Sequence, residues 1–267
     1  MGFRYLLPIA FLAVSGSPGS PLADQNPSGL IFVSGFDDGR FDGWQLEKGT
    51  DHAIRLVESP VRDGRHAVRV ELRRDDPLVA GSKRAELKLN SEPSSTTERW
   101  YAFSLYLDQG YVRDPAPEIV AQWHATPDRK RGEIWRSPPL ALLTQDGNWC
   151  VQWLWDRDRV MRKNQFDGQR RASLGPYATG RWTDWVFHVR WAWNGKGLLE
   201  VWRDRHKVLS YKGPIGFNDE RGVYFKIGLY KWLWATAPGK TTTKKRVIYV
   251  DAVRIGNAAA ALDDVRP

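Results

Sequence analysis

Polar and apolar positions alternate along much of this chain, in short runs that turn-forming residues separate. The runs are rich in Val, Ile, Trp, Tyr and Phe, and Gly, Pro, Asp and Asn bound them. Alternation with a period of two is typical of a strand that buries one face. The pattern predicts strands at Leu30–Val33, Ala53–Val57, His66–Leu72, Lys83–Leu89, Trp100–Leu107, Glu118–His124, Leu140–Thr144, Asn148–Trp155, Trp182–Trp193, Leu198–Arg203, Lys207–Tyr211, Tyr224–Tyr230 and Val247–Ile255.

The succession of these elements indicates the fold class. No long stretch has the period of an amphipathic helix, and no internal repeat occurs. Strands without helices between them predict an all-β chain, folded as an antiparallel β-sandwich or jelly roll. Asn194-Gly195, between two strands, predicts a type I′ hairpin, and Gln145–Asn148 predicts a second tight turn. Long irregular stretches often form binding-site walls, and here they are Asp108–Pro117, Ala125–Pro139, Asp156–Gly180 and Trp232–Thr243.

Three of the predicted strands share an unusual polar face. Their opposite face is apolar and would enter the core, with Ala85, Leu87, Trp123, Phe225, Ile227 and Leu229. The polar face combines a phenol, an imidazole, an amide and several cations, which suit an anionic substrate and a proton transfer. It therefore indicates an enzyme. Its members are Arg84, Glu86, Lys88, Gln122, His124, Tyr224, Lys226 and Tyr230.

Each of these strands also has a plainer interpretation. His124, which projects beside Gln122, could act as a general base or only bond to a neighbouring strand. Tyr230 could exchange a proton if Lys226, Arg84 and His124 stabilise its anion, because the pKa of a free phenol is about 10. Otherwise it lies on a solvated strand. Between Lys226 and Tyr230, Gly228 leaves room for a ligand to approach the backbone.

The Arg84–Lys88 strand is open to two interpretations. Arg84 could clamp a substrate carboxylate, with Glu86 orienting Arg84 or Lys226 and with Lys88 nearby. Alternatively, the strand carries an ordinary ladder of ion pairs.

Tryptophan is abundant, with 14 residues, and most of them are expected to fill the core. Trp135, Trp232 and Trp234 lie in predicted loops or at strand ends, so we expect them to stack on sugar rings.

The chain is basic, with a net charge of +9 and a pI of about 9.7. This balance suits an acidic polymer. The basic residues are scattered, which argues against nucleic acid, and the runs Arg129–Arg131 and Lys244–Arg246 read as solvated loops. Cys150, the only cysteine, is expected to be buried and inert.

Residues 1–26 have the layout of a secretory signal and a short linker. Arg4 precedes an apolar stretch, Tyr5–Val14, and small residues follow it. The stretch is too short to span a bilayer, and no later segment is a candidate. The sequence thus predicts a single domain at 27–267, secreted or periplasmic, monomeric and without a membrane partner.

Several enzyme classes lack their motifs in this chain. It has no His-Glu-x-x-His, no Cys-x-x-Cys, no phosphate-binding Gly-rich loop and no Gly-x-Ser-x-Gly. A retaining glycosidase needs two carboxylates on one face, whereas Glu133 has no alternating partner. Hydrolysis of a glycosidic bond is therefore disfavoured.

The three motifs, in this order, resemble those of jelly-roll polysaccharide lyases. Alginate lyases of that group have Arg-x-Glu-x-Arg, Gln-Ile/Val-His and Tyr-x-Lys-x-Gly-x-Tyr-x-Gln. This chain has Lys88 in place of the second Arg, Trp123 in place of the aliphatic residue and Trp232 in place of the last Gln. These forms look closer to the glucuronan-lyase and heparin-lyase branch. The similarity runs from about Gly35 to Gly256 and implies a concanavalin-A-like jelly roll with a concave basic and aromatic groove.

The resemblance implies β-elimination at a uronate in an anionic polysaccharide, leaving a 4,5-unsaturated end. Arg84 and Gln122 would neutralise the carboxylate, and His124 or Tyr230 would remove the C5 proton. Tyr230 would protonate the leaving oxygen, and Lys226 would lower its pKa or bind substrate charge. Substrate contacts are expected from Glu86, Lys88, Tyr224, Trp232 and Trp135.

No cofactor is expected for the reaction. Some proteins of this group carry calcium, and Asp37, Asp38 and Asp251 could hold a structural ion, although acidic turns are commonly only turns.

The alternatives from other classes are a carbohydrate-binding module on the same fold, a sandwich glycosidase and a nucleic-acid binder. The sequence leaves open which uronan is cleaved, endo or exo action, the identity of the base and the need for calcium.

Overall fold

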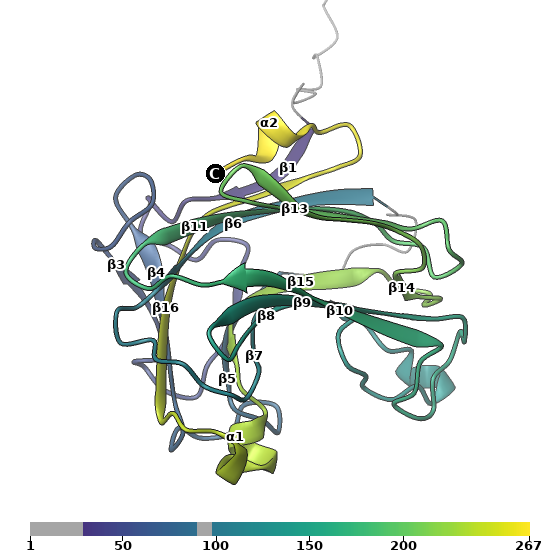
Figure 1. The fold of residues 1–267 in the computed structure, drawn as a ribbon, viewed down its shortest axis with the longest axis horizontal. Helices are drawn as coiled ribbons and strands as arrows, with labels where there is room; N and C mark the ends of the chain where they lie inside the picture. Colours follow the sequence, from purple (N-terminus) through teal and green to yellow (C-terminus); the bar gives the residue numbers. More distant parts are fainter. Residues whose placement is uncertain (1–28, 90–97) are drawn as a thin grey trace, which may run out of the picture.

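The computed structural model describes residues 29–89 and 98–267, so the predicted signal segment lies outside the described residues. Two sheets of eight strands each form a sandwich within this range. In Figure 1, β6, β11 and β13 form a layer above β8, β9, β10 and β15. The predicted all-β antiparallel sandwich is confirmed.

The first sheet is continuous from β13 to β3. Its order is β13-β12-β11-β6-β16-β4-β3, and β1 pairs with β16. The strands are β13 (His206–Lys212), β12 (Leu198–Arg203), β11 (Trp182–Arg190), β6 (Glu98–Leu107), β16 (Lys245–Gly256), β4 (Ala67–Arg73), β3 (Ile54–Val57) and β1 (Leu30–Ser34).

The second sheet contains all three polar motifs. Its order is β10-β9-β8-β7-β15-β5-β2, and the short β14 pairs with β9 in parallel. The strands are β10 (Gly168–Pro176), β9 (Asn148–Asp156), β8 (Leu140–Gln145), β7 (Glu118–Ala125), β15 (Val223–Tyr230), β5 (Arg84–Lys88), β2 (Gln45–Glu47) and β14 (Gly216–Phe217).

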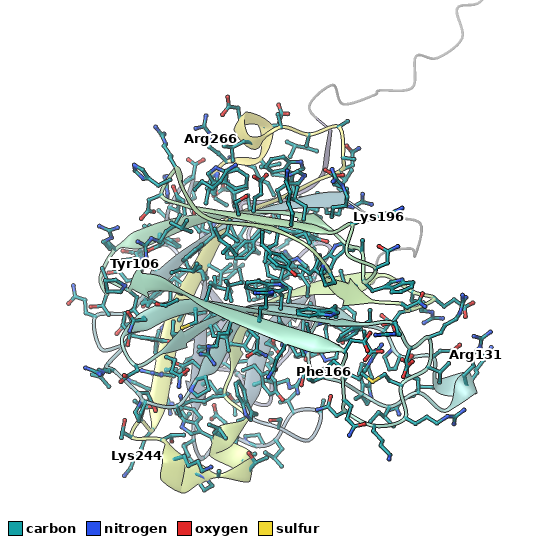
Figure 2. All side chains as sticks on the ribbon, turned by 45° about the vertical axis from the view of Figure 1, so that its right-hand side comes forward. Tyr106, Arg131, Phe166, Lys196, Lys244 and Arg266 are labelled. Carbon is teal, nitrogen blue, oxygen red and sulfur yellow. The ribbon has the colours of Figure 1, made fainter. Side chains whose placement is uncertain are left out.

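The core lies between the two sheets, where side chains fill the space in Figure 2. The apolar faces of the three motif strands enter it, as the alternation predicts. Phe225 contacts Tyr101, Phe103 and Trp123 through ring centroids 5.3–5.6 Å apart. Burial of one face of β5, β7 and β15 therefore fixes which side chains those strands present outside. The core-facing residues are Ala85, Leu87, Trp123, Phe225, Ile227 and Leu229.

The thirteen predicted strands are all present, and most ends shift by one or two residues. The structure adds β2, β10 and β14. β10 lies inside the stretch predicted to be irregular, because it is an edge strand that pairs only with β9. Most of its residues are at least partly exposed, so it lacks an apolar alternation. Cys150 is buried, as expected.

One of the two predicted turns is wrong. Asp146 and Gly147 both have positive φ and join β8 to β9 as a two-residue hairpin. In contrast, β11 already ends at Arg190 and β12 begins at Leu198, so Asn194-Gly195 lies within a longer loop. Gly195 has a positive φ and Asn194 does not, which excludes type I′.

Short helical turns lie at the ends of the second sheet. They are η1 (Arg129–Arg131), α1 (Leu233–Thr236) and η2 (Pro238–Lys240), while α2 (Leu262–Val265) lies beside β1 (Figure 1). No helix in the described ranges is long and apolar enough to span a membrane.

Candidate active site

The three polar motifs lie on neighbouring strands, with β15 between β7 and β5. Lys226 of β15 stands opposite Gln122 of β7 and Lys88 of β5. In the next row on one side, Tyr224 stands opposite His124; on the other side, beyond the row of Gly228 and Glu86, Tyr230 stands opposite Arg84. Segments that are about 140 residues apart in the chain thus meet on the outer face of the second sheet.

Gly228 allows β15 to pass close to β5. Its φ is +145°, and a Cβ at this position would lie 2.3 Å from the Ala85 carbonyl oxygen. Because that neighbour is backbone, no side chain can be accommodated without moving a strand. The β7–β15 register also shifts between Ile227 and Tyr230. Glycine here therefore sets the position of Tyr230 relative to the rest of the strand.

An ion-pair cluster, which we call the site network, lies within this face, with two members buried and two partly buried. It consists of Glu47, Arg84, Glu86 and Lys226. The Lys226 ammonium is 2.6 Å from Glu47 and 3.3 Å from Glu86. One Arg84 guanidinium nitrogen is 3.5 Å from each of the same carboxylates. Although burial opposes the charged form, Lys226 and Arg84 hold the pKa of Glu47 below its usual value.

Two polar atoms of the site face have no hydrogen-bond partner among the described residues. The Gln122 amide nitrogen donates to Glu86, which leaves the Gln122 carbonyl oxygen unpaired. The Arg84 Nε is unpaired as well. Buried polar atoms are normally satisfied, so each of these two atoms lacks a partner that the described residues do not supply.

His124 is held in its neutral form with one nitrogen available. Its Nδ1 lies 2.9 Å from the Ala125 carbonyl oxygen, which can only accept, so Nδ1 carries the proton. Burial, reinforced by the positive charges of Lys226 and Arg84, lowers the pKa of His124 to about 4. Nε2 is therefore an unprotonated acceptor at neutral pH.

Tyr224 connects His124 to Lys88. Its ring stacks on the imidazole with centroids 5.5 Å apart, and the Lys88 ammonium lies 4.7 Å from its centre. Burial raises the pKa of Tyr224, and the nearby carboxylates Glu47 and Glu86 raise it further. Tyr224 thus stays protonated and cannot serve as a base at neutral pH.

Tyr230 lies at the other end of the face and is only partly buried. The Arg84 guanidinium carbon is 4.4 Å from the centre of its ring, and the Trp232 ring lies 5.6 Å away. A guanidinium in this position is attracted to the face of the phenol ring. Arg84 therefore connects Tyr230 with the site network.

Two of the three candidate sugar-stacking tryptophans remain accessible. Trp135 is 53% exposed, and its edge meets His124 at 5.6 Å between centroids. Trp232 is partly exposed beside Tyr230. The expectation for Trp234 is wrong, because this residue is only 3% exposed and packs into the core from α1.

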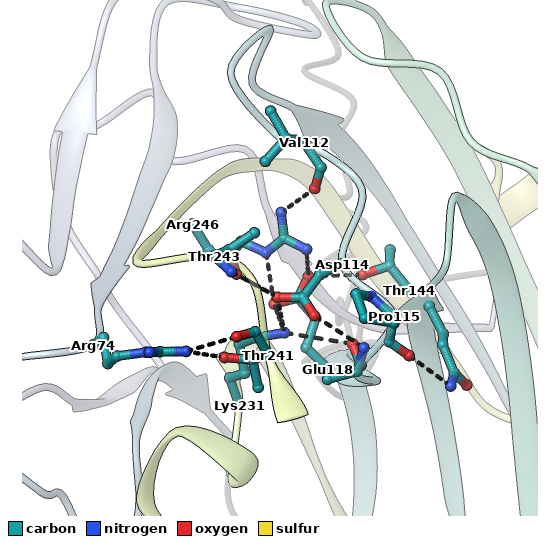
Figure 3. A network of polar contacts seen from close by, with 12 residues as sticks. Arg74, Val112, Asp114, Pro115, Glu118, Thr144, Lys231, Thr241, Thr243 and Arg246 are labelled. Atoms are coloured by element: carbon teal, nitrogen blue, oxygen red, sulfur yellow. Dashed lines mark hydrogen bonds and ion pairs between the residues drawn. The ribbon is translucent and has the colours of Figure 1, made fainter. Parts of the chain in front are cut away.

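A second ion-pair cluster, the strand-end network, lies where β7 begins and β15 ends. It consists of Asp114, Glu118, Lys231 and Arg246 (Figure 3). Lys231 lies 3.3 Å from Asp114 and 3.2 Å from Glu118, and Arg246 approaches Glu118 to 2.7 Å. None of these side chains is more than 2% exposed. The network fixes the residue that follows Tyr230 and leaves no charge open to a ligand.

A family model described as polysaccharide lyase matches residues 36–254. The chain belongs to the polysaccharide lyase family. No curated protein matches its sequence. The match covers all three strands of the site, from Arg84 to Tyr230.

Solved structures share the jelly-roll fold with this polysaccharide lyase. An endo-β-1,4-glucuronan lyase from the fungus Trichoderma reesei has a TM-score of 0.72 and 21% identity, over 85% of this chain and 95% of that one. An alginate lyase from Pseudomonas aeruginosa has a TM-score of 0.52 and 16% identity, over 80% and 98%. A binding domain of botulinum neurotoxin has a TM-score of 0.54 and 9% identity, over 89% and 49%. At these identities the likeness establishes the fold alone.

Glu133 of this lyase is not one of two accessible carboxylates, as a glycosidase would require. This residue is 1% exposed, and it accepts hydrogen bonds from the backbone N–H groups of Asp128 and Met161. Its carboxylate also forms an ion pair with Arg136 at 3.0 Å. Glu133 therefore ties loops together, which argues against the glycosidase alternative.

The acidic residues considered for calcium bind backbone instead. Asp37 accepts the N–H groups of Arg65 and His66, Asp251 accepts that of Arg62, and Asp38 pairs with the exposed Arg40. Within residues 29–89 and 98–267, no group of three or more His, Cys, Asp or Glu is arranged to hold a metal ion. A structural calcium ion here stays a prediction.

One residue of the site is not indicated by the sequence. Glu47 lies on β2, a strand of three residues that carries no motif, and it reaches Lys226 only because β2 pairs with β5. A single acidic residue followed by Lys48 gives no signal of its own. Only the sheet order places it in the network.

Proposed function

We propose that this lyase cleaves a uronic-acid polysaccharide by β-elimination. The C5–H bond and the bond between C4 and the glycosidic oxygen break, and a C4–C5 double bond forms. A base takes the C5 proton, and an acid protonates the leaving oxygen. One observation carries the proposal. The neutral imidazole of His124, the phenol of Tyr230 and the guanidinium of Arg84, whose Nε is unpaired, lie on one face of the second sheet.

Arg84 and Gln122 would bind the uronate carboxylate. As the C5 proton leaves, negative charge spreads onto this carboxylate, so a fixed cation there lowers the barrier. The Arg84 Nε has no partner among the described residues, and a carboxylate that reached it would satisfy this donor. A second N–H of Gln122 can donate in the same way.

Lys226 would act as a positioning residue. Both of its ion-pair partners are protein carboxylates, at 2.6 Å and 3.3 Å. By holding Glu47 and Glu86 it orients Arg84 and Gln122, whereas direct contact with substrate would require it to leave them.

His124 would accept the C5 proton at Nε2, and Tyr230 would donate its phenolic proton to the leaving oxygen. A neutral imidazole with a free nitrogen supports the first assignment. Tyr230 is partly exposed, and its ring centre lies 4.4 Å from Arg84, whose charge also acts on His124, which supports the second. Proton exchange with water then restores both groups.

Polyglucuronate is the substrate that we would test first. The net charge of +9 favours an anionic polymer, and the Trichoderma enzyme of the same fold is a glucuronan lyase. Purified protein would be incubated with polyglucuronate, polymannuronate, polyguluronate and heparin, and ultraviolet absorbance of the unsaturated product would be followed. A rise with one polymer supports elimination and names the substrate. Chain cleavage without a double bond would overturn it.

The proposal includes further expectations about location, oligomeric state, cofactors and partners. They are export to the periplasm or the medium, a monomeric state, no required cofactor and no nucleic-acid or membrane partner. Mature-terminus sequencing and light scattering of the secreted protein would test the first two.

A further inference from the structure

A basic cavity of about 470 Å³ lies beside the site face, between η1 and the loop that precedes β15. Figure 2 shows Arg131 projecting from this edge of the molecule. The sequence suggested only a solvated basic run here. The charged residues that line the cavity are Asp128, Arg129, Lys130, Arg131, Glu220 and Arg221.

The cations of this cavity are not all neutralised by the protein. Arg131 pairs with Asp128 at 3.3 Å. Lys130 and Arg221 are exposed and form no ion pair with any residue that the structure describes. Four cations against two carboxylates give an excess positive charge, and cations held around one cavity favour an anion between them.

The walls of the cavity are held in place from beneath. Glu133 accepts the Asp128 N–H at 2.6 Å and pairs with Arg136, which in turn pairs with Asp219. The Arg136 guanidinium also lies 4.1 Å from the centre of the Phe217 ring. These buried contacts join η1 to the loop before β15. They therefore hold the backbone at Lys130 and Arg221 in place, which lowers the entropy cost of binding a ligand there.

The cavity adjoins the proposed catalytic row through Trp135. The Arg129 guanidinium lies 5.3 Å from the centre of the Trp135 ring, and the same ring meets His124 at 5.6 Å. Trp135 is 53% exposed, so a sugar ring can stack on it. A polymer that passes His124 and stacks on Trp135 then reaches the cavity.

We propose that this cavity is a distal subsite, in which Lys130 and Arg221 bind the carboxylate of a uronate beyond the sugar stacked on Trp135. The proposal rests on the proposed function, because it takes a polyuronate as the ligand. It makes affinity depend on chain length: a short oligomer fills the catalytic row alone, and a longer one also reaches Lys130 and Arg221.

The test compares oligomers of two lengths. Calorimetric affinities would be measured for a trimer and a heptamer of β-1,4-linked glucuronate, using Tyr230→Phe to prevent cleavage. Adding Lys130→Ala and Arg221→Ala should weaken heptamer binding about tenfold, as two partly exposed ion pairs would, and leave the trimer unchanged. A neutral β-1,4-glucose hexamer should show no effect of the two substitutions.

Lys244→Ala with Lys245→Ala is the matched control. It removes the same charge from the far side of the molecule, where Lys244 lies opposite Arg131 in Figure 2. An unchanged heptamer affinity after the cavity substitutions would overturn the subsite. An equal loss for trimer and heptamer, or an equal loss in the control, would also overturn it.

Turnover by the wild-type protein separates this proposal from the proposed function. If polyglucuronate is cleaved and the cavity substitutions change neither affinity nor KM, the subsite alone fails. If no polyuronate is cleaved and the heptamer still binds in a manner that needs Lys130 and Arg221, elimination fails and the cavity is supported.

Discussion

The site network and the strand-end network contain the same four charges, two carboxylates, one lysine and one arginine, and differ in how completely these are satisfied. In the strand-end network, Glu118 also accepts from Tyr111 and Thr144, and Asp114 accepts from Thr243. In the site network, the Arg84 contacts are 3.5 Å long and Arg84 Nε is unpaired, as is the carbonyl oxygen of Gln122, which donates to Glu86.

The difference in completeness distinguishes a structural cluster from a binding site. A closed cluster holds strands together, and any ligand would have to displace a protein contact. An open cluster of zero net charge still offers a donor and an acceptor, at positions that its own ion pairs fix. Disruption of the first should therefore reduce stability, and disruption of the second should reduce turnover.

The largest expected effect on stability is that of Glu118→Gln. It leaves Lys231 and Arg246 with one carboxylate between them in a fully buried setting, which should cost about 3–5 kcal/mol of unfolding free energy. Urea unfolding would measure it. Adding Lys231→Met removes the excess charge and should recover much of the loss. A loss below about 1 kcal/mol would mean that the network is not the buried cluster described.

Glu86→Gln should reduce turnover strongly and stability only moderately. Glu47 still pairs with Lys226, so the loss of stability should be about 1–3 kcal/mol. Turnover should fall about 100-fold, because Gln122 and Arg84 lose the carboxylate that orients them. Steady-state kinetics and urea unfolding of the same preparation would show both. A stability loss as large as that of Glu118→Gln with normal turnover would reverse the comparison.

A smaller effect is expected in the titration of His124. Since burial holds its pKa near 4, the ring should stay neutral from pH 5 to pH 8 in an NMR titration, with His124→Asn assigning its signal. An unfolded histidine titrates near ~6.5, so this residue contributes stability above that pH, which is lost as pH falls toward about 4. A signal that titrates near its ordinary value would remove the neutral base from the mechanism.

Much of the site face could be predicted from the sequence, because strand alternation fixes which side chains share a face. Alternation alone puts Gln122 beside His124, and Lys226 on the same side as Tyr230, whatever the strand order. Glu47 could not be predicted, since its role depends on the pairing of β2 with β5. The burial of Trp234 was missed because a one-turn helix directs its ring inward. The basic residues of η1 gave no sign that a cavity would form beside Trp135.

The central claim is that the open network serves a reaction at Tyr230. Its most direct test compares Tyr230→Phe with wild type on the polymer that wild type cleaves, with Tyr106→Phe on the first sheet as the control. The account predicts that Tyr230→Phe lowers the rate of double-bond formation about 10²–10⁴-fold while binding of the polymer stays within about twofold, and that the control is unchanged. Turnover by Tyr230→Phe at the wild-type rate would contradict it, and binding without turnover by the wild type would favour a carbohydrate-binding module on the same fold.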